Sequence, residues 1–338
     1  MLDALLARRW MFAIAGSLTG LSVLAAARAD QPIVLNWPVA CELGHTCFVQ
    51  NYVDHDSSDA ASDFRCGSRT YNTHDGTDIR PIDASSDNSG VAVLAAAAGR
   101  VLRTRDGASD ISIRTTGPAA VSGQECGNGM VIDHGQGWST QYCHLRSGSI
   151  LVAPGEIVKA GAPLGKVGLS GRTEVPHLHL TVRHEGIIVD PFAYQQSPGA
   201  CSDGRSLWAE GTPGVLNYKA REIINFGLAG ALATMENIES GALKRQTPDP
   251  ASDDLVAYVR AIGLRKGDVQ IISLRSPDGK LFSENRFPAL DHDKAEFFVS
   301  TGRHRGEVPW PQGTYEVSYQ VFTGSDQVLA TTFRVAIE

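Results

Sequence analysis

The chain has 338 residues, of which 42% are hydrophobic, and its formal net charge is −7. This length suggests about two domains of ordinary size. An acidic chain without runs of lysine and arginine is a poor candidate for binding nucleic acid or an anionic membrane surface, so we expect neither kind of partner.

The first 29 residues have the pattern of a secretory signal peptide. Arg8 and Arg9 precede an apolar run that extends from Trp10 to about Ala27, and small residues occupy the cleavage-type positions. The run is about long enough to span a bilayer, so an uncleaved anchor is the alternative. We expect residues 1–29 to be removed, which leaves about 309 residues, a net charge near −9 and no later membrane span.

Six cysteines lie between residues 41 and 201. In an exported chain, an even number of cysteines predicts disulfides, which persist in oxidising compartments. Spacing does not choose among the 15 pairings that six cysteines allow. One pair can be argued, because residues 126–143 read as strand, glycine-containing turn and strand. Folding at the turn brings Cys126 close to Cys143.

Residues 30–195 are predicted to form the first domain, and its initial segment, residues 30–70, is irregular and rich in cysteine. Between residues 91 and 182, short β-branched runs alternate with glycine-containing turns, without a long helical period. This pattern predicts an antiparallel β domain. Residues 196–210 have the composition of a linker.

Residues 211–338 are predicted to hold a mixed segment followed by a second β domain. One or two short helices could lie in the mixed segment, and residues 253–262 fit either a helix or a strand. From Asp268 onward apolar and polar residues alternate, and one face of a strand collects Tyr315, Val317, Tyr319 and Val321. We therefore expect a β-sandwich-like domain and an all-β-dominated fold class, with a short helical segment between the domains.

The stretch "VPHLHLTV" (residues 175–182) contains two histidines that share one face of a strand. Side chains alternate along a strand, so Pro176, Leu178, Leu180 and Val182 share a core face, and the other face holds Val175, His177, His179 and Thr181. The two histidine Cα atoms are about 6–7 Å apart. The pair alone fits two structural histidines as well as a metal site.

Two further stretches supply side chains that suit a metal site. "THDGTDIRP" (residues 73–81) places His74 and Asp78 four residues apart, with a glycine between them that allows the backbone to bend. Imidazole and carboxylate both suit zinc, although a solvated turn would also explain the segment. "QYCHLRSGS" adds His144 at a strand end, and alternation places it on the same face as Tyr142.

These stretches together give five candidates, and a catalytic zinc needs only three protein ligands and one open position. Some of the five must therefore act as bases or orienting groups. Spacing does not decide which, because two neighbouring histidines on one face of a strand can both bind a metal.

The motifs "HDGTD", "QYCHL" and "PHLHLTVR", in this order, resemble those of the lysostaphin/LytM-type zinc metallopeptidases, which are peptidoglycan endopeptidases with an antiparallel β fold. The resemblance covers roughly residues 41–194, including the glycine-rich connectors. It implies that Zn²⁺ is bound by His74, Asp78 and His179, and that His144 and His177 are the catalytic residues.

The resemblance implies a periplasmic or secreted zinc endopeptidase that hydrolyses peptide bonds in bacterial cell-wall peptidoglycan. A zinc-activated water would attack the scissile carbonyl while a histidine accepts the proton of that water. Two alternatives stay open: a non-catalytic regulator or wall-binding protein that activates other hydrolases, and a peptidase acting on ordinary proteins. The resemblance does not cover the C-terminal domain, for which we expect a role in binding the wall or a protein partner.

Overall fold

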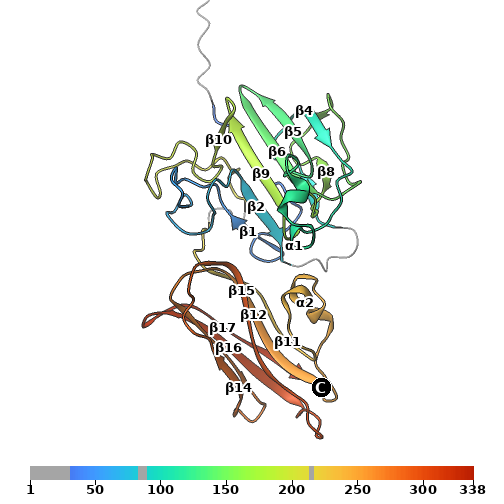
Figure 1. The fold of residues 1–338 in the computed structure, drawn as a ribbon, viewed down its shortest axis with the longest axis vertical. Helices are drawn as coiled ribbons and strands as arrows, with labels where there is room; N and C mark the ends of the chain where they lie inside the picture. Colours follow the sequence, from blue (N-terminus) through green and yellow to red (C-terminus); the bar gives the residue numbers. More distant parts are fainter. Residues whose placement is uncertain (1–30, 83–89, 213–216) are drawn as a thin grey trace, which may run out of the picture. The chain divides into compact units, whose positions relative to one another are not determined.

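The computed structural model describes residues 31–82, 90–212 and 217–338. The predicted signal peptide, residues 1–29, lies outside these ranges. The described residues form mostly antiparallel sheets with a few short helical turns, which confirms the predicted fold class (Figure 1). In the same ranges, every helix is too short or too polar to cross a bilayer.

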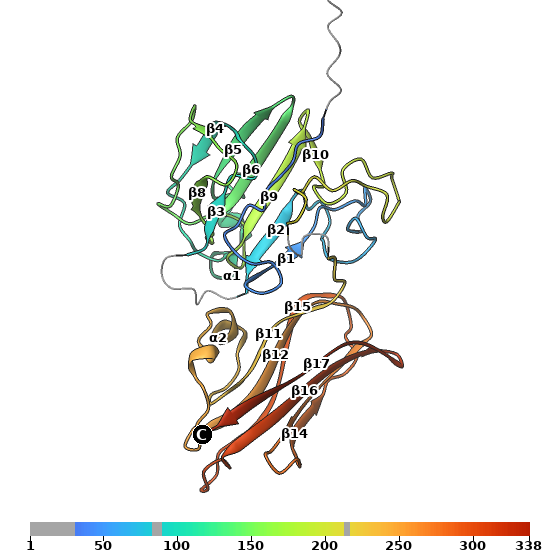
Figure 2. The ribbon, with the colours of Figure 1, turned by 180° about the vertical axis from the view of Figure 1, so that it is seen from behind.

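An eight-stranded antiparallel sheet forms the body of the first domain. Strands follow the order β1-β2-β9-β6-β5-β4-β7 across it, and β10 pairs with β9; Figure 2 shows this sheet from behind. The strands are β1 (Cys47–Asn51), β2 (Thr77–Pro81), β4 (Gly99–Arg105), β5 (Asn128–Gly135), β6 (Trp138–Leu145), β7 (Ile157–Val158), β9 (Leu178–His184) and β10 (Ile187–Val189). A separate pair is formed by β3 (Ala92–Leu94) and β8 (Pro163–Lys166), and the helical turns are α1 (Ile113–Thr116) and η1 (Pro118–Val121).

The central strand β9 divides its side chains between the two faces of the sheet as alternation predicts. Leu178, Leu180 and Val182 are buried in the apolar core of the domain. His179 and Thr181 lie on the opposite face, where they line a cleft. Pro176, which precedes the strand, is half-buried and lies outside this core.

Strand β6 departs from regular alternation at its C-terminal end. In its pairing with β5, Tyr142 lies opposite Met130 and Leu145 lies opposite Asn128, so two residues of β6 face one residue of β5. This is a β-bulge, which reverses the sense of alternation beyond it. Tyr142 is in the core, whereas His144 lines the cleft. The prediction that these two residues share a face is therefore wrong.

Three disulfides join all six cysteines. The predicted Cys126–Cys143 bond is present, and the other pairs are Cys41–Cys47 and Cys66–Cys201. The last of these attaches residues 196–210, the segment predicted as a linker, to the first domain. The end of that segment also packs there, since the side chains of Leu207 and Trp208 belong to the core of the domain.

The C-terminal residues form a β-sandwich of two sheets around one apolar core. One sheet contains β11 (Glu222–Ala229), β12 (Asp254–Leu264) and β15 (Lys294–His304). The other contains β13 (Asp268–Arg275), β14 (Leu281–Arg286), β16 (Gly313–Thr323) and β17 (Asp326–Ile337). Short helical turns α2 (Met235–Glu239) and η2 (Leu243–Arg245) follow β11.

Two predictions made from the sequence of this region can be compared with the structure. Residues 253–262, which fit either a helix or a strand, lie almost entirely in β12. The alternation in β16 is as predicted, because its core face collects the fully buried side chains of Tyr315, Val317, Tyr319 and Val321.

Candidate metal centre

The pairing of β2 with β9 brings Asp78 directly opposite His179. His74 lies three residues before β2, and the three side chains are almost completely buried. Gly76 makes this close approach possible. A Cβ atom at this position would lie 2.6 Å from His179 Nε2 and 2.8 Å from the Leu180 carbonyl oxygen, nearer than real Cβ atoms come.

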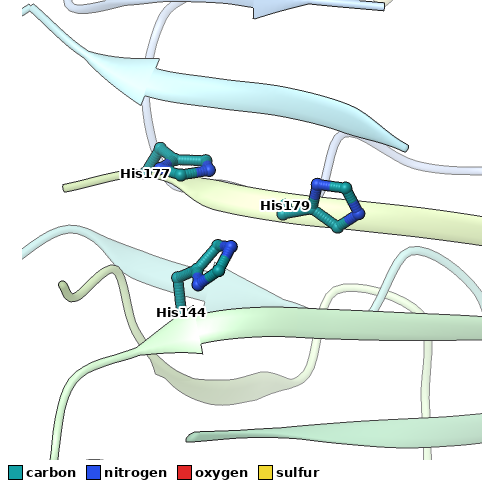
Figure 3. Close-up of side chains that lie close together, drawn as sticks. All are labelled: His144, His177 and His179. Carbon is teal, nitrogen blue, oxygen red and sulfur yellow. The ribbon is translucent and has the colours of Figure 1, made fainter. Parts of the chain in front are cut away.

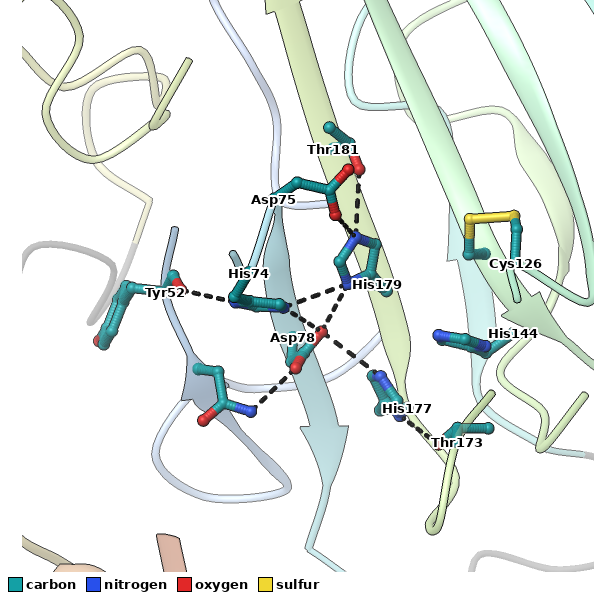
Figure 4. Close-up of polar contacts among 12 residues, drawn as sticks. Tyr52, His74, Asp75, Asp78, Cys126, His144, Thr173, His177, His179 and Thr181 are labelled. Carbon is teal, nitrogen blue, oxygen red and sulfur yellow. Dashed lines mark hydrogen bonds and ion pairs between the residues drawn. A yellow bond between two sulfur atoms is a disulfide. The ribbon is translucent and has the colours of Figure 1, made fainter. Parts of the chain in front are cut away.

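Three ligand-type atoms converge at this point (Figure 4). Asp78 Oδ1 lies 2.9 Å from His179 Nδ1 and 3.2 Å from His74 Nε2, and the two nitrogens are 3.2 Å apart. Two ligands of one tetrahedral zinc ion, each about 2.0–2.1 Å from it, are about 3.3 Å apart. The spacing and the chemistry of this group therefore fit zinc.

Hydrogen bonds on the far side of His74 and Asp78 fix their orientation. His74 Nδ1 donates to the Tyr52 carbonyl oxygen at 2.6 Å, which leaves Nε2 as the nitrogen facing Asp78. Asn51 Nδ2 donates to the second carboxylate oxygen of Asp78 at 2.9 Å. Partners of this kind set the tautomer and direction of metal ligands. The sequence contains no signal for Asn51 or Tyr52, because only the pairing of β1 with β2 places them here.

Asp75 and Thr181 perform the same role for His179. The ring presents Nδ1 to Asp78, and Nε2 lies 3.0 Å from Asp75 Oδ1 and 3.1 Å from Thr181 Oγ1 (Figure 4). Arg183 Nη2 lies 3.5 Å from the other oxygen of Asp75. No sequence pattern singled out Asp75, although it lies inside the "HDGTD" motif, between the two proposed ligands.

His177 and His144 lie beside this group, His177 immediately before β9 and His144 on β6 (Figure 3). Their ring centroids are 4.7 Å apart. His177 Nδ1 donates to the Val175 carbonyl oxygen at 2.9 Å, and His144 Nδ1 donates to the Ser170 carbonyl oxygen at 2.8 Å. In both rings Nε2 is therefore the nitrogen left for chemistry. His177 Nε2 lies 3.4 Å from Asp78 Oδ1.

The surroundings of the site lower the pKa values of both Asp78 and His144. Burial opposes ionisation of Asp78, but the nearby histidines His74, His177 and His179 outweigh it and hold the pKa of this carboxyl well below its usual value. Burial, reinforced by the neighbouring His177 and His179, keeps the pKa of His144 well below the ordinary histidine value. Asp78 is therefore a carboxylate and His144 a neutral imidazole near neutral pH.

Two overlapping groups of side chains in the described residues could hold a metal ion. One consists of His74, Asp78 and His179, and the other of His144, His177 and His179. The structure thus brings together all five residues that the sequence singled out. Only the first group combines two imidazoles with a carboxylate.

The centre opens into a cleft of about 830 Å³. Four of the five candidates line it, and His74 lies behind them. Charged side chains of both signs form its walls, among them Arg114, Glu125, Arg172 and Glu174. A cleft of this size is in the usual range of ligand-binding pockets in proteins.

Residues 72–191 match the family model described as Peptidase family M23. The first domain therefore belongs to this family of metallopeptidases, and the resemblance to the lysostaphin/LytM type is confirmed for it. The match lies within the predicted peptidase domain, and its ends enclose all five candidate residues.

Individual relatives match shorter segments. The chain is 36% identical over 109 residues to the outer membrane antigenic lipoprotein B of Haemophilus influenzae, covering 32% of this chain and 22% of the relative. It is 43% identical over 56 residues to the peptidoglycan DD-endopeptidase ShyB of Vibrio cholerae, covering 17% of this chain and 13% of the relative. A solved zinc-containing peptidase from Vibrio cholerae is 26% identical with a TM-score of 0.27, covering 43% of this chain and 39% of that one. The chain thus spans less than a quarter of the length of these two curated relatives.

Proposed function

We propose that this protein is a zinc metalloendopeptidase that hydrolyses peptide bonds in bacterial cell-wall peptidoglycan. The observation that carries the proposal is the buried group of His74, Asp78 and His179, with the ring nitrogens of His144 and His177 beside it. We assign the first three residues to zinc and the last two to proton transfer. A bound zinc ion lowers the pKa of a coordinated water toward about 7 and polarises a carbonyl.

His144 and His177 are oriented for work on protons. Because Nδ1 of each ring donates to a backbone carbonyl, Nε2 of the neutral ring carries the lone pair. His144 is buried and neutral, so its Nε2 can accept the proton of an attacking water and deliver it to the leaving amine. We assign the second proton-transfer role to His177, whose Nε2 lies 3.4 Å from Asp78 Oδ1.

The choice of peptidoglycan rests on the family of the domain and on the relative named as a peptidoglycan DD-endopeptidase. Location outside the cytoplasm agrees with this substrate. Three disulfides join all six cysteines, as is usual in the periplasm and in secreted proteins. Binding of the wall or of a protein partner by the C-terminal sandwich stays a prediction.

Digestion of purified peptidoglycan by the chain without residues 1–29 tests the proposal. We expect new amine ends, identified by mass spectrometry of the fragments, and we expect their loss when a chelator removes the metal. If no peptidoglycan type yields new ends, or if the chelator changes nothing, the enzyme assignment fails. In that case a regulator of other hydrolases becomes the better assignment, and a casein digest under the same conditions would detect a peptidase of ordinary proteins.

Zinc content tests the division of roles among the five residues. We expect His74→Ala, Asp78→Ala and His179→Ala to lose zinc, and His177→Ala and His144→Ala to retain it while turnover falls by at least a hundredfold. Zinc loss from His177→Ala would overturn the assignment. A matched control is His304→Ala, which removes an exposed histidine from the C-terminal sandwich.

A further inference from the structure

His144 has a backbone conformation that is unusual for a histidine. Its φ angle is +64°, in the left-handed region, and its side chain is buried. Residues other than glycine occupy this region only when the surrounding structure holds them there, and such residues are concentrated at functional sites. The conformation coincides with the bulge of β6, which turns the ring away from the core and into the cleft.

Cys126 and Cys143 form the covalent connection at this bulge. The disulfide joins Cys143, the residue immediately before His144, to Cys126 at the base of β5 (Figure 4). The same Cys126 accepts a hydrogen bond at its carbonyl oxygen from the His144 backbone N–H, at 2.8 Å. Cys126 therefore holds the backbone of the histidine from two directions, through the neighbouring side chain and through the amide.

The opposite side of His144 is held by Ser170. Its carbonyl oxygen accepts from His144 Nδ1, and its hydroxyl accepts from the Asn128 backbone N–H at 2.9 Å and donates to the Leu145 carbonyl oxygen at 2.7 Å. These contacts depend on the segment that follows Cys126, because Asn128 lies only two residues further along. Movement of Cys126 would therefore loosen the contacts on both sides of the ring.

We propose that the Cys126–Cys143 disulfide is a positioning element for His144, holding it in the left-handed conformation that directs Nε2 into the cleft. The inference rests on the proposed function and assigns the two cysteines a role in turnover rather than in metal binding. Cys143 pairs with the proposed ligand His179 through the backbone of β6 and β9, and this strand pairing does not depend on the sulfur atoms. Loss of the disulfide should therefore leave zinc bound but allow the His144 ring to move from its position in the cleft.

The competing explanation is that the disulfide only stabilises the folded domain and does not affect the position of the His144 ring. The double variant Cys126→Ser/Cys143→Ser separates the two, with Cys41→Ser/Cys47→Ser as the matched control. The control removes another short-range disulfide of the same domain, with a sequence separation of 6 residues against 17.

Three quantities should be measured on both variants: zinc content, kcat and KM on peptidoglycan, and hydrogen exchange of the His144 amide. For Cys126→Ser/Cys143→Ser we expect zinc at the wild-type level, kcat lower by about tenfold to a hundredfold, little change in KM, and faster exchange at His144. For the control we expect kcat and the exchange rate of that amide to stay at the wild-type level.

The proposal is overturned if the two variants lose the same share of kcat, if zinc is lost together with kcat, or if exchange at His144 is unchanged. If the serine variant fails to fold, Cys126→Ala/Cys143→Val removes the disulfide with apolar side chains instead. The same three measurements on this variant then support or overturn the proposal. If the wild-type protein hydrolyses nothing, the proposed function fails, while the exchange comparison still tests whether the disulfide holds His144.

Discussion

His179 illustrates how single residues define this centre, because each of its ring nitrogens has a separate set of partners. Nδ1 faces Asp78, and Nε2 faces Asp75 and Thr181. The hydrogen bonds at Nε2 place the proton on that nitrogen and leave the lone pair of Nδ1 for a metal. Burial alone would lower the pKa of the His179 ring, but the two carboxylates outweigh it and raise this pKa to about 9, so a metal ion that binds Nδ1 must displace the second ring proton.

Replacement of Asp75 should therefore weaken zinc binding, although Asp75 is not one of the proposed ligands. We expect Asp75→Ala to lower zinc affinity by about tenfold to a hundredfold, the usual effect of losing an outer partner of a metal ligand. Asp75→Asn should have a smaller effect, because its amide oxygen can still accept from Nε2–H. Competition with a chromophoric chelator measures these affinities.

Asp59→Asn is the control for charge, since it removes one exposed carboxylate from the same domain. Thr181→Val tests whether both acceptors serve the same proton. In that case each acceptor compensates for loss of the other, and the double variant with Asp75→Ala loses more affinity than the two single effects added together. Equal affinities in wild type and Asp75→Ala would contradict the role given to this residue.

At the scale of elements, the centre depends on close contact between β9 and the turn that leads into β2. Gly76 is the point of contact, because a Cβ atom there would overlap both the His179 ring and the backbone oxygen of Leu180. The backbone of a central strand cannot move away without disturbing its pairing on both sides. The conflict must therefore be relieved by displacing the His179 ring or the turn that carries His74.

Gly76→Ala is accordingly expected to lower zinc content and activity together, with a modest effect on folding. The cost of overpacking a site of this kind is about 1–3 kcal/mol in free energy of unfolding. Zinc analysis and thermal unfolding check the two parts of the prediction. Gly306→Ala is the control, because a Cβ atom at Gly306 would meet nothing within 4 Å. Full zinc occupancy in Gly76→Ala would show that the turn can adjust.

At the scale of the whole molecule, the C-terminal sandwich has its own buried charge. Asp268 is completely buried, which by itself disfavours ionisation, but four donors surround it. Arg221 donates from Nε and Nη2 at 2.7 and 2.9 Å, the Thr323 hydroxyl donates at 2.6 Å, and the Arg265 backbone N–H donates at 2.8 Å. Together they hold the pKa of Asp268 below its usual value.

This lowered pKa links the stability of the sandwich to pH. Because the folded pKa lies below that of the unfolded chain, about 3.9, the contribution of Asp268 is complete above that pH and is lost as pH falls through the folded pKa. We expect Asp268→Asn to cost about 2–3 kcal/mol at pH 7, less than for a fully buried pair because Arg221 keeps some contact with water. The difference from wild type should shrink as the pH is lowered below about 4.

Urea unfolding of the full chain at pH 7 and at about pH 3 measures this difference. Glu316→Gln is the control, because the partner of Glu316, Arg334, is 71% exposed and the loss of such a pair costs less than about 1 kcal/mol. An effect of Asp268→Asn that is independent of pH would show that the side chain contributes by packing alone.

The sequence alone predicted most strands between residues 91 and 182 and from Asp268 onward, the Cys126–Cys143 pair and the division of β9 into a core face and a histidine face. It missed β1, which lies in the segment expected to be irregular, and β11, which lies in the mixed segment. The predicted features depend on spacing along one strand or one hairpin, and the two-residue period of a strand makes that spacing readable. The motifs, through their resemblance to a family, also singled out the five residues that the structure brings together. These features depend on residues close to one another along the chain, so the sequence was sufficient to predict them.

Features that depend on contacts between distant segments could be seen only in the folded chain. Asn51 and Tyr52 reach the centre because β1 pairs with β2, and residues 196–210 pack onto the first domain because Cys66 is joined to Cys201. His144 is the clearest case. Alternation placed it on the same face as Tyr142, and the bulge, which forms against β5 and is held by Cys126, turns it into the cleft. A bulge depends on the partner strand as well as on its own residues, so the sequence of β6 alone could not reveal it.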